Sequence, residues 1–517
     1  MATTPIGTDP STLPDHVDVL VVGAGVSGIG MACHLTRECP SMSYAIVESR
    51  LDLGGTWDLF TYPGIRSDSD MYTFGYDFKP WESDEAIAKG PAIKAYVTET
   101  ANEYDVMRHI TFARRVTAAS WDADRAVWTV TLTHLDGDGE PTGGTSEVTC
   151  GWLQMCTGYY SYSEPYRPEF PGESSFRGRI EHPQHWPDDL QTTEQLEGKR
   201  VVIIGSGATA VTLLPALTDL GAHVTMLQRS PTWIFPAPNT NVLRTAIRKV
   251  LPSAAGYKLI RFLNTKRGEL VYRQSRTNPE KVKSLINKEV GKALGDRLPM
   301  DPHFTPAYDP WDQRLCLSPD GDFFAAITNG DATVVTDHVE TFDADGIVLQ
   351  GGGRLDADIV VTATGLTMLT LGGLTPVVDG VEVDLADTFT YKGFMYSGVP
   401  NLGTTFGYIN ASWTLRADLI ARYVCRLLTS MELKGATMVR PVVDDPTMER
   451  RPYVVDFPAG YMQRRLHTFP AQGDRDPWTA SQSYSYDKNV LLAPDAEIDD
   501  GVLEFSDPSR IPAAAGR

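Results

Sequence analysis

The feature that most constrains this chain is a short apolar strand that leads directly into closely spaced glycines and an apolar helix. The stretch VDVLVVGAGVSGIGMACHL places Gly23, Gly25 and Gly28 in GxGxxG spacing. Such glycines allow a tight turn, close approach of backbone amides to a pyrophosphate, and close packing of helix on strand. A glycine-rich turn alone would be weak evidence, but strand, glycines and helix in this order predict a dinucleotide site.

The residue that ends the next strand indicates which dinucleotide binds there. SYAIVES carries Glu48 at the end of its apolar run, twenty residues after Gly28. A carboxylate at this point accepts hydrogen bonds from a ribose with a free 2′-hydroxyl, as in FAD or NAD.

A second copy of the pattern ends differently. KRVVIIGSGATAVTLLPAL carries Gly205, Gly207 and Ala210, and the following strand, HVTMLQRSP, ends in Arg229 and Ser230. A cation and a hydroxyl suit a 2′-phosphate, so this site is expected to prefer NADPH. The alternative is that Arg229 is an ordinary solvated arginine.

Two such units about 180 residues apart predict an α/β fold with two Rossmann-like dinucleotide-binding domains, one for FAD and one for NADPH. The expected division is 1–165 and 370–517 for the FAD-binding domain, 166–240 and 311–369 for the NADP-binding domain, and 241–310 for a helical insertion. The segments LQMCTGYY and DIVVTATGL fit crossings between the domains, although plain core strands with turns explain them as well.

The charge balance narrows the partners and the compartment. With 46 Lys and Arg against 66 Asp and Glu, the net charge of -20 repels phosphates, so no nucleic acid partner is expected, and the charge argues against a membrane-surface protein overall. The first twenty residues lack the basic start and apolar run of a signal peptide, and no stretch reaches the apolar length of a spanning helix. We therefore expect a cytoplasmic protein.

The cysteines argue against one fate of a reduced flavin. They lie without a CxxC or any regular framework, at Cys33, Cys39, Cys150, Cys156, Cys316 and Cys425, and are expected to be reduced core residues. A disulfide reductase needs two neighbouring cysteines beside the flavin. Of the two remaining acceptors, an electron carrier and oxygen, oxygen is the better candidate, and an oxygenated flavin anion requires a fixed cation.

Two longer motifs resemble a known family. GGTWDLFTYPGIRSD, from Gly54 to Asp68, fits [A/G]GxWx4[F/Y]P[G/M]x3D, and FRGRIEHPQHWPDD fits FxGxxxHxxxWP followed by Asp or Pro. Both are similar to motifs of the class B flavin monooxygenases that perform Baeyer–Villiger oxidations. The resemblance extends over nearly the whole chain, and is strongest with the actinobacterial branch that includes ethionamide-activating enzymes. It implies that Gly55, Trp57, Tyr62 and Asp68 are among the cofactor contacts.

His182 and His185 have a spacing that often marks a metal site. No metal is expected, because no further ligand lies at usable spacing and Pro183 and Pro187 prevent the helix that would align the two rings. The family resemblance implies instead that His182 lies in a linker and couples the two domains during NADPH use, and that Trp186 anchors this linker. His185 is expected to be an ordinary surface or satisfied histidine.

The resemblance also implies the catalytic pair, Arg314 in WDQRLCL and Asp68. A guanidinium keeps its proton at neutral pH and can hold a peroxide anion, while a carboxylate beside it fixes its orientation. From the residues alone, Arg314 is a salt-bridge arginine, and Arg66 or Asp70 could replace a member of the pair. Many relatives have a Lys that contacts the 2′-phosphate where this chain has Gln313. The expected NADPH preference therefore depends mainly on Arg229 and Ser230.

The resemblance predicts an enzyme that uses NADPH, O2 and FAD to convert ketones to esters or lactones through a peroxyflavin, with sulfoxidation of thioethers as a side activity. Asn410 and Trp413, in GYINASWTL, are expected near the substrate pocket, although core packing accounts for Trp413 nearly as well. Two alternatives stay open. One is a flavin monooxygenase acting mainly on sulfur or nitrogen nucleophiles, and the other is a non-catalytic NADPH or redox sensor on the same fold.

The segment from Asn241 to Met300 has a charge opposite to that of the whole chain. It contains 14 Lys or Arg against 4 acidic residues and has helical character. A solvated charged face explains this excess, and weak contact with a membrane surface is the alternative.

Overall fold

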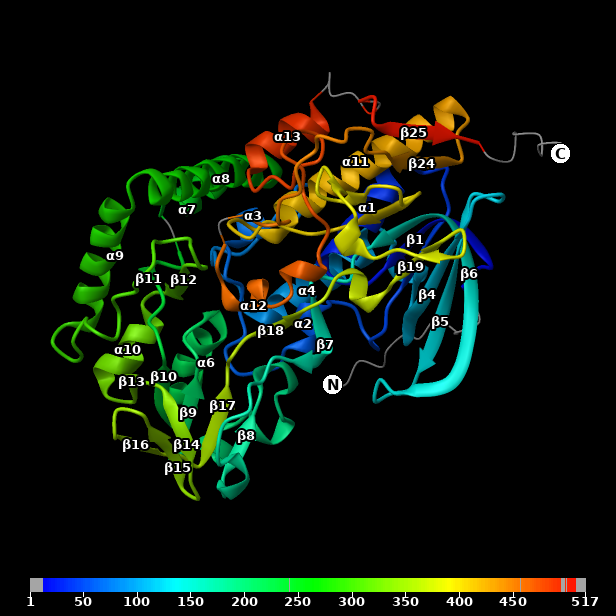
Figure 1. The fold of residues 1–517 in the computed structure, drawn as a ribbon. Coiled ribbons are helices and arrows are strands. Elements are labelled where there is room, and N and C mark those ends of the chain that lie inside the picture. Colours follow the sequence, from blue (N-terminus) through cyan, green and yellow to red (C-terminus); the bar gives the residue numbers. More distant parts are fainter. Residues whose placement is uncertain (1–12, 241, 456, 494–497, 499, 508–517) are drawn as a thin grey trace.

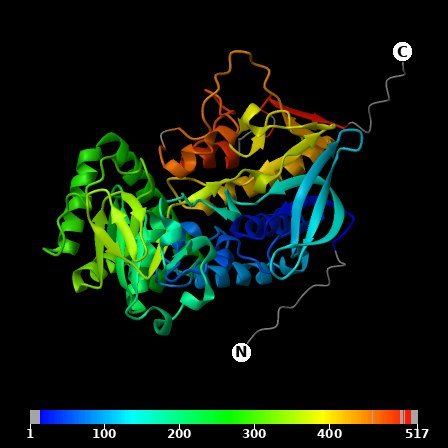
Figure 2. The same cartoon turned by 60° about the horizontal axis from the view of Figure 1, so that its bottom comes forward.

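The computed structural model describes residues 13–240, 242–455, 457–493, 498 and 500–507. Within these residues the chain forms two α/β units that lie side by side, each built on its own sheet (Figures 1 and 2). This is the expected architecture. Part of the N-terminal stretch used for the localisation argument falls outside the described residues.

The first unit is built on a sheet of nine strands in the described part of the chain. They are β1 (His16–Val22), β2 (Tyr44–Val47), β3 (Ile110–Thr111), β4 (Arg114–Asp122), β5 (Val127–Leu135), β6 (Pro141–Met155), β19 (Pro376–Val378), β20 (Val381–Glu382) and β23 (Leu402–Thr404). Their order is β20-β19-β4-β5-β6-β1-β2-β3, with β23 also on β6. β1 runs parallel to β2 and β6, whereas β4, β5 and β6 form an antiparallel meander.

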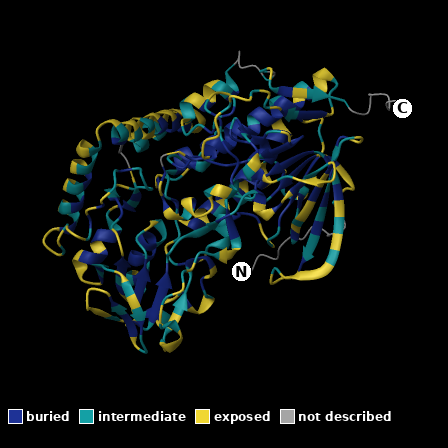
Figure 3. Cartoon of the chain, viewed as in Figure 1, coloured by how far each residue is buried: buried dark blue, intermediate teal, exposed yellow. Residues whose placement is uncertain are grey.

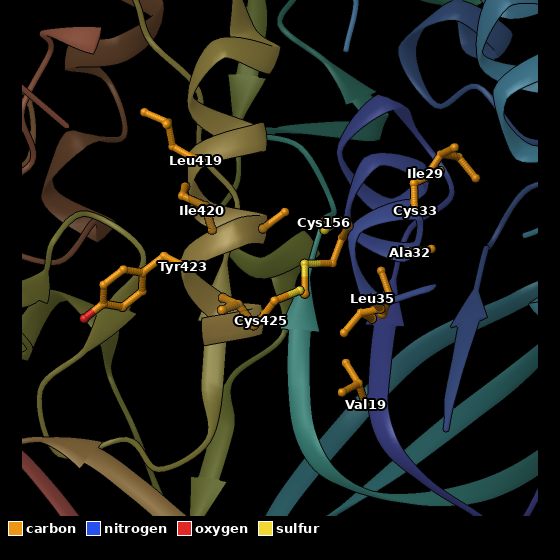
Figure 4. Packing of buried hydrophobic residues seen from close by; sticks show 14 of the residues in the cluster. Val19, Ile29, Ala32, Cys33, Leu35, Cys156, Leu419, Ile420, Tyr423 and Cys425 are labelled. Carbon is orange, nitrogen blue, oxygen red and sulfur yellow. The ribbon is translucent and has the colours of Figure 1, made fainter. Parts of the chain in front are cut away.

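Helices α1 (Val26–Glu38) and α11 (Trp413–Lys434) pack side by side against this sheet (Figure 4). In α1, Ala32 and Cys33 follow Ile29 by three and four residues, so the three side chains share one face of the helix. All three are buried. Ile420 and Val424 of α11 belong to the same cluster. The C-terminal part of the chain therefore completes the core that the first residues begin.

The second unit is a five-stranded parallel sheet within the described residues, in the order β13-β10-β9-β17-β8. Its strands are β8 (Arg179–Glu181), β9 (Arg200–Ile204), β10 (His223–Gln228), β13 (Ala332–Thr336) and β17 (Ile359–Thr362). Helices α6 (Ala208–Asp219) and α10 (Asp322–Asn329) cover one face, and the hairpin strands β14 (Val339–Phe342), β15 (Gly346–Leu349) and β16 (Arg354–Asp356) pack on the other. Buried strands without polar alternation are typical of a parallel sheet covered on both faces.

Three helices follow β10 and β11 (Ile234–Ala237) within residues 241–310: α7 (Val242–Val250), α8 (Ser253–Thr277) and α9 (Pro279–Leu294). They line the edge of the molecule, and α8 runs from the second unit across to the first (Figure 1). α9 packs on the second unit through Ile286, Val290 and Leu294.

A buried charged cluster fastens α8 to the first unit. Arg261 donates through Nη1 to the carbonyl oxygens of Thr73 at 3.0 Å and Gly75 at 2.6 Å, and through Nη2 to Asp418 at 3.2 Å. His34 lies on the other side of Asp418, 3.6 Å away. Burial lowers the pKa of His34, but Asp418 and the acidic residue one turn along α1 more than offset this and raise it to about 9.

Among the described residues, this cluster also brings together three side chains of types that can bind a metal ion. One ligand atom each of His34, Asp77 and Asp418 lies within 4.8 Å of the others. Arg261 already supplies a positive charge to Asp418 here. The cluster is therefore an ionic anchor for α8.

The other α-helices and β-strands of the described residues are α2 (Thr56–Leu59), α3 (Met71–Phe74), α4 (Gly90–Glu103), β7 (Tyr160–Pro165), α5 (Thr193–Leu196), β12 (Cys316–Pro319), β18 (Leu366–Met368), β21 (Thr390–Tyr391), β22 (Met395–Tyr396), β24 (Met438–Pro441), α12 (Gly460–Gln463), α13 (Tyr484–Leu492) and β25 (Leu503–Ser506). β7 and β18 pair where the chain passes between the units. Among the described residues, no helix has both the length and the apolar character needed to cross a membrane.

Candidate active site

The first glycine turn has the close contacts that its motif predicts. Gly23 has φ +104°, and a Cβ there would lie 2.6 Å from the carbonyl oxygen of Cys156. A Cβ on Gly28 would lie 1.8 Å from the carbonyl oxygen of Gly23. The turn at the start of α1 therefore requires glycine at both positions.

Glu48 holds this turn in place. Its carboxylate is buried and accepts hydrogen bonds from the backbone N–H of Ala24 at 2.7 Å and of Arg50 at 2.9 Å. Its expected contact with a ribose stays a prediction. Sequence reasoning missed the bond to Ala24, which joins the end of β2 to the glycine turn.

The second turn leaves room for a phosphate. Gly205 has φ +137°, and a Cβ there would lie 2.3 Å from the carbonyl oxygen of Ala363, whereas a Cβ on Gly207 would meet no described atom within 4 Å. This open space at the start of α6 fits the approach of a pyrophosphate to the backbone. Ala210 is fully buried, as close packing of α6 on β9 requires.

Arg229 and Ser230 are exposed at the end of β10. Ser206 of the glycine turn donates through Oγ to the carbonyl oxygen of Ser230 at 3.1 Å, so the turn and the strand end are held together. The geometry fits a 2′-phosphate at this edge, and the contact stays a prediction.

Arg464, which sequence reasoning missed, lies close enough to Arg229 for their positive charges to repel. Its guanidinium carbon is 3.3 Å from the centroid of the Tyr166 ring. Partial burial lowers the pKa of Arg464, and the positive charge of Arg229 lowers it further. Arg464 forms no ion pair with any described residue, so two arginines lie near the end of β10 without a carboxylate on Arg464. Arg464 is exposed and lies in an irregular segment, so no local sequence signal could have predicted its position near Arg229.

The first long motif packs against the second unit. Tyr62 is buried in the core of that unit, among residues of α6 and α10, rather than in the first unit. Gly64 has φ +78°, and a Cβ there would lie 2.6 Å from Cβ of Ala216 and 3.0 Å from the carbonyl oxygen of Thr212, both on α6. The motif is therefore a contact between the units.

The start of the motif stays in the first unit. Gly55 has φ +58°, and a Cβ there would lie 3.0 Å from Cα of Gly25. Trp57 packs edge to face on Phe74, with ring centroids 5.7 Å apart. Their expected contacts with a flavin nucleotide stay predictions.

Asp68 and Arg314 come together although 246 residues separate them. Arg314 donates through Nη1 to Asp68 and through Nη2 to the carbonyl oxygen of Ile409 at 3.1 Å. Burial lowers the pKa of Arg314, but the Asp68 carboxylate more than offsets this, so the pKa lies above its usual range. A third of each side chain stays exposed, which leaves the cation accessible.

The two alternative members of the pair are engaged elsewhere. Arg66 forms an ion pair with Asp322 of α10. Asp70 caps α3 by accepting from the backbone N–H of Thr73 at 3.2 Å, and it also accepts from Asn264 of α8 at 2.9 Å. Both therefore hold the segments around Asp68.

Trp413 closes the site from the side of α11. Its indole N–H donates to Ser27 Oγ in the first turn of α1 at 2.8 Å, and its ring stacks on Tyr159 with centroids 5.2 Å apart. Asn410 donates to the carbonyl oxygen of Gln482 at 3.1 Å. Its Oδ1 is buried without a hydrogen-bond partner among the described residues. This acceptor lies next in sequence to the carbonyl bonded by Arg314, so it fits the polar end of a bound molecule.

The linker motif joins β7 to the second sheet. His182 accepts through Nδ1 from the backbone N–H of Gln184 at 3.1 Å and starts a short turn of 3-10 helix. Burial lowers the pKa of His182 to about 4, so its ring is neutral at neutral pH. Trp186 is buried in the second unit and donates to the carbonyl oxygen of Leu190 at 3.0 Å. Coupling by His182 and anchoring by Trp186 stay predictions that this placement fits.

The cysteines carry no redox-active pair that faces this site. All six are free thiols with buried side chains. Burial raises the pKa of Cys33, Cys156 and Cys316 to about 12 each, so these thiols stay protonated.

Known proteins align with almost the whole chain. It is 46% identical over 497 residues to the FAD-containing monooxygenase EthA of Mycobacterium tuberculosis, and the alignment covers 96% of this chain and 98% of that protein. The chain belongs to the class B flavoprotein monooxygenases. A second relative is the probable FAD-binding monooxygenase AlmA of Acinetobacter baylyi. It is 45% identical over 492 residues, and the alignment covers 95% of this chain and 96% of that protein.

Solved class B structures share the fold. A polycyclic ketone monooxygenase from the fungus Thermothelomyces thermophila superposes with a TM-score of 0.75 at 16% identity, covering 97% of this chain and 91% of that one. An oxidised steroid monooxygenase bound to NADP gives a TM-score of 0.73 at 22% identity, covering 95% and 100%. The family model for pyridine nucleotide-disulphide oxidoreductases matches residues 17–250.

Proposed function

We propose that this flavoprotein monooxygenase oxidises ketones to esters or lactones. One oxygen atom of O2 enters the bond beside the carbonyl carbon, the other leaves as water, and NADPH and a proton supply the reducing equivalents. The observation that carries the proposal is the Asp68–Arg314 ion pair, a fixed and accessible cation at the junction of the two units.

FAD, when bound and reduced, supplies the activation of O2. Gly23, Gly28 and Glu48 shape the first turn for this cofactor, because a side chain on either glycine would collide with backbone and the carboxylate holds the turn. Gly207 leaves the second turn open for the pyrophosphate of NADPH, and Arg229 with Ser230 offers a cation and a hydroxyl to its 2′-phosphate.

Arg314 serves the oxygen chemistry by remaining protonated. Its raised pKa means that it offers positive charge, not a proton, to an anionic oxygen at Nη1 or Nη2. Asp68 and the carbonyl of Ile409 restrict its orientation. Attack on a carbonyl carbon places negative charge on oxygen, so the step that gains most from Arg314 is the one with a carbonyl substrate.

Thioether oxidation follows as a side activity, because a sulfur nucleophile takes up oxygen without forming a charged carbonyl adduct. Trp413, Tyr159 and Phe406 give the surroundings of Arg314 an aromatic character that suits apolar substituents on either substrate class. A purely sensory role would leave the paired cation without use.

The test compares Arg314→Ala and Arg314→Lys with the unmodified enzyme. Loss of one preorganised cation is expected to lower ester formation by about 10²- to 10³-fold. Flavin reduction by NADPH, followed anaerobically by absorbance, is expected to persist in both variants. Arg314→Lys keeps the charge but not the two-pronged geometry, so it should retain part of the activity.

Product analysis with linear, cyclic and aryl ketones beside a thioether separates the candidates. Ester formation that survives in Arg314→Ala contradicts the proposal. Sulfoxide formed by the unmodified enzyme with no ester from any ketone would instead assign the enzyme to sulfur nucleophiles.

The domain division remains part of this proposal and has the support of the sheets. β1 to β6, β19, β20 and β23 fall within 1–165 and 370–517, and β8, β9, β10, β13 and β17 fall within 166–240 and 311–369. Helices α7, α8 and α9 fall within 241–310. We also propose a cytoplasmic location, on the basis of the sequence argument given above.

A further inference from the structure

The outer face of α8 carries a stripe of exposed apolar side chains. Leu259, Phe262, Leu263 and Leu270 follow the spacing i, i+3, i+4 and i+11, which places them along one side of a helix. Phe262 is 58% exposed and Leu270 is 48% exposed. At 1.5 Å per residue the stripe is about 16 Å long.

The opposite face of α8 is fixed, so the stripe cannot turn inward. Tyr257, Ile260, Arg261 and Thr265 are buried. Tyr257 donates to the carbonyl oxygen of Tyr76 at 2.8 Å, and Arg261 is held by the ionic anchor described above. The stripe therefore faces outward at the edge of the molecule (Figures 1 and 3).

Exposed apolar side chains concentrate in this insertion. Among the described residues, 15 large apolar side chains are exposed, and nine of them lie between residues 243 and 285. These nine are Leu243, Val250, Leu251, Leu259, Phe262, Leu263, Leu270, Val271 and Leu285. The other six lie within residues 1–165 and 370–517 and form no counterpart to the stripe.

Basic residues border the stripe. At 100° per residue, Lys258 lies on one side of it and Arg267 on the other, and both are exposed. Neither forms an ion pair with a described residue. Lys266, which pairs with Glu269, lies within the stripe and is also exposed. Residues 241–300 carry a net charge of +10 (14 - 4), so the rest of the chain carries -30 (-20 - 10).

We propose that the outer face of α8 is a peripheral docking surface for anionic lipid bilayers. An apolar stripe enters the boundary between headgroups and acyl chains, while flanking Lys and Arg contact the anionic headgroups. The strong negative charge of the remaining chain is repelled by the same surface, which orients the molecule with the insertion toward the bilayer. The buried face of α8 contacts the segment that follows Asp68, so docking brings the candidate active site near apolar molecules dissolved in the membrane.

A second copy of the chain fits this face less well. A symmetric contact between two stripes brings Lys258 and Arg267 of one copy against the same residues of the other, where like charges repel. A contact with another face meets only scattered exposed apolar side chains, which offer no matching apolar area. An anionic bilayer matches both features, because its headgroups attract the flanking cations and its acyl region accommodates the apolar side chains.

The test measures co-sedimentation of the flavin-loaded full-length protein with vesicles of phosphatidylcholine, with and without phosphatidylglycerol. Binding is expected only with phosphatidylglycerol and is expected to weaken as salt is raised. The double substitution Lys258→Glu and Arg267→Glu is expected to lower the partition coefficient by about thirtyfold or more, since each surface cation near an anionic bilayer contributes about fivefold. Phe262→Ser with Leu263→Ser should lower it by at least tenfold.

Matched controls lie elsewhere on the surface. Leu433 is 84% exposed on α11, and Lys199 is exposed at the start of β9. Leu433→Ser and Lys199→Glu should leave vesicle binding unchanged, and NADPH oxidation in solution should be unchanged in every variant. The proposal is overturned if the protein binds neither vesicle, if the α8 variants bind as the unmodified protein does, or if those variants instead abolish self-association seen by sedimentation velocity.

Discussion

Substitution of Gly64 tests whether contact between the two units sets the rate of flavin reduction. Gly64→Ala places a Cβ 2.6 Å from Cβ of Ala216 and 3.0 Å from the carbonyl oxygen of Thr212. An ordinary contact between two such carbons is 3.5–4.0 Å, so α6 must move by about 1 Å relative to the motif. A displacement of this size between reacting groups lowers rates by about a hundredfold.

Gly398 offers a control that separates backbone strain from the collision. It has φ +79°, against +78° for Gly64, but a Cβ there would meet no described atom within 4 Å. Both substitutions carry the same cost of about 1 kcal/mol for a left-handed alanine. Gly64→Ala should destabilise the protein by about 1 to 3 kcal/mol more, because of overpacking.

The assay is anaerobic stopped-flow reduction of bound flavin by NADPH, with thermal unfolding measured on the same samples. Gly64→Ala should slow reduction strongly at unchanged flavin content, and Gly398→Ala should reduce at the normal rate. In the background of Gly64→Ala, Ala216→Gly removes the nearest atom and should restore part of the rate, which a double-mutant cycle quantifies. Equal reduction rates for Gly64→Ala and Gly398→Ala would refute the reasoning.

Other predictions follow from charges described above. Arg464→Ala should weaken binding of NADP+ by about tenfold and leave that of NAD+ nearly unchanged in titration calorimetry, because only NADP+ carries the 2′-phosphate; equal losses for both would contradict it. His34 has a pKa raised from 6.5 to about 9, so its contribution to stability is complete below pH 6.5 and is lost as the pH rises through 9. Unfolding free energy should therefore fall by up to about 3 kcal/mol over this range in the unmodified protein, and a His34→Gln variant with the same pH profile would count against it. Glu48→Gln keeps one carbonyl oxygen for the two backbone donors, Ala24 and Arg50, so the purified protein should contain less FAD by its absorbance ratio; full flavin content would contradict this.

The two nucleotide units were predictable because their determinants are local. Gly23 and Gly205 have positive φ and lie against backbone carbonyl oxygens, which is a steric requirement of the strand–turn–helix itself. The same holds for the basic helical insertion, whose spacing and charge are visible in one continuous segment.

The pair of Asp68 and Arg314 had no such local signal. The two residues are 246 positions apart, and an arginine in a loop has many possible partners, so only the family resemblance pointed to them. Contacts between the units were missed for the same reason. Nothing in the sequence indicates that Gly64 meets α6, or that Tyr62 belongs to the core of the second unit.

The attachment of α8 through Arg261 has a consequence for enzyme engineering. A chimera that exchanges insertions between relatives transfers one half of an ionic network whose other half, His34 and Asp418, remains on the recipient. An unmatched recipient would hold a buried charge without its counterion. Successful grafts of this region should therefore carry α8 together with the corresponding positions of α1 and α11.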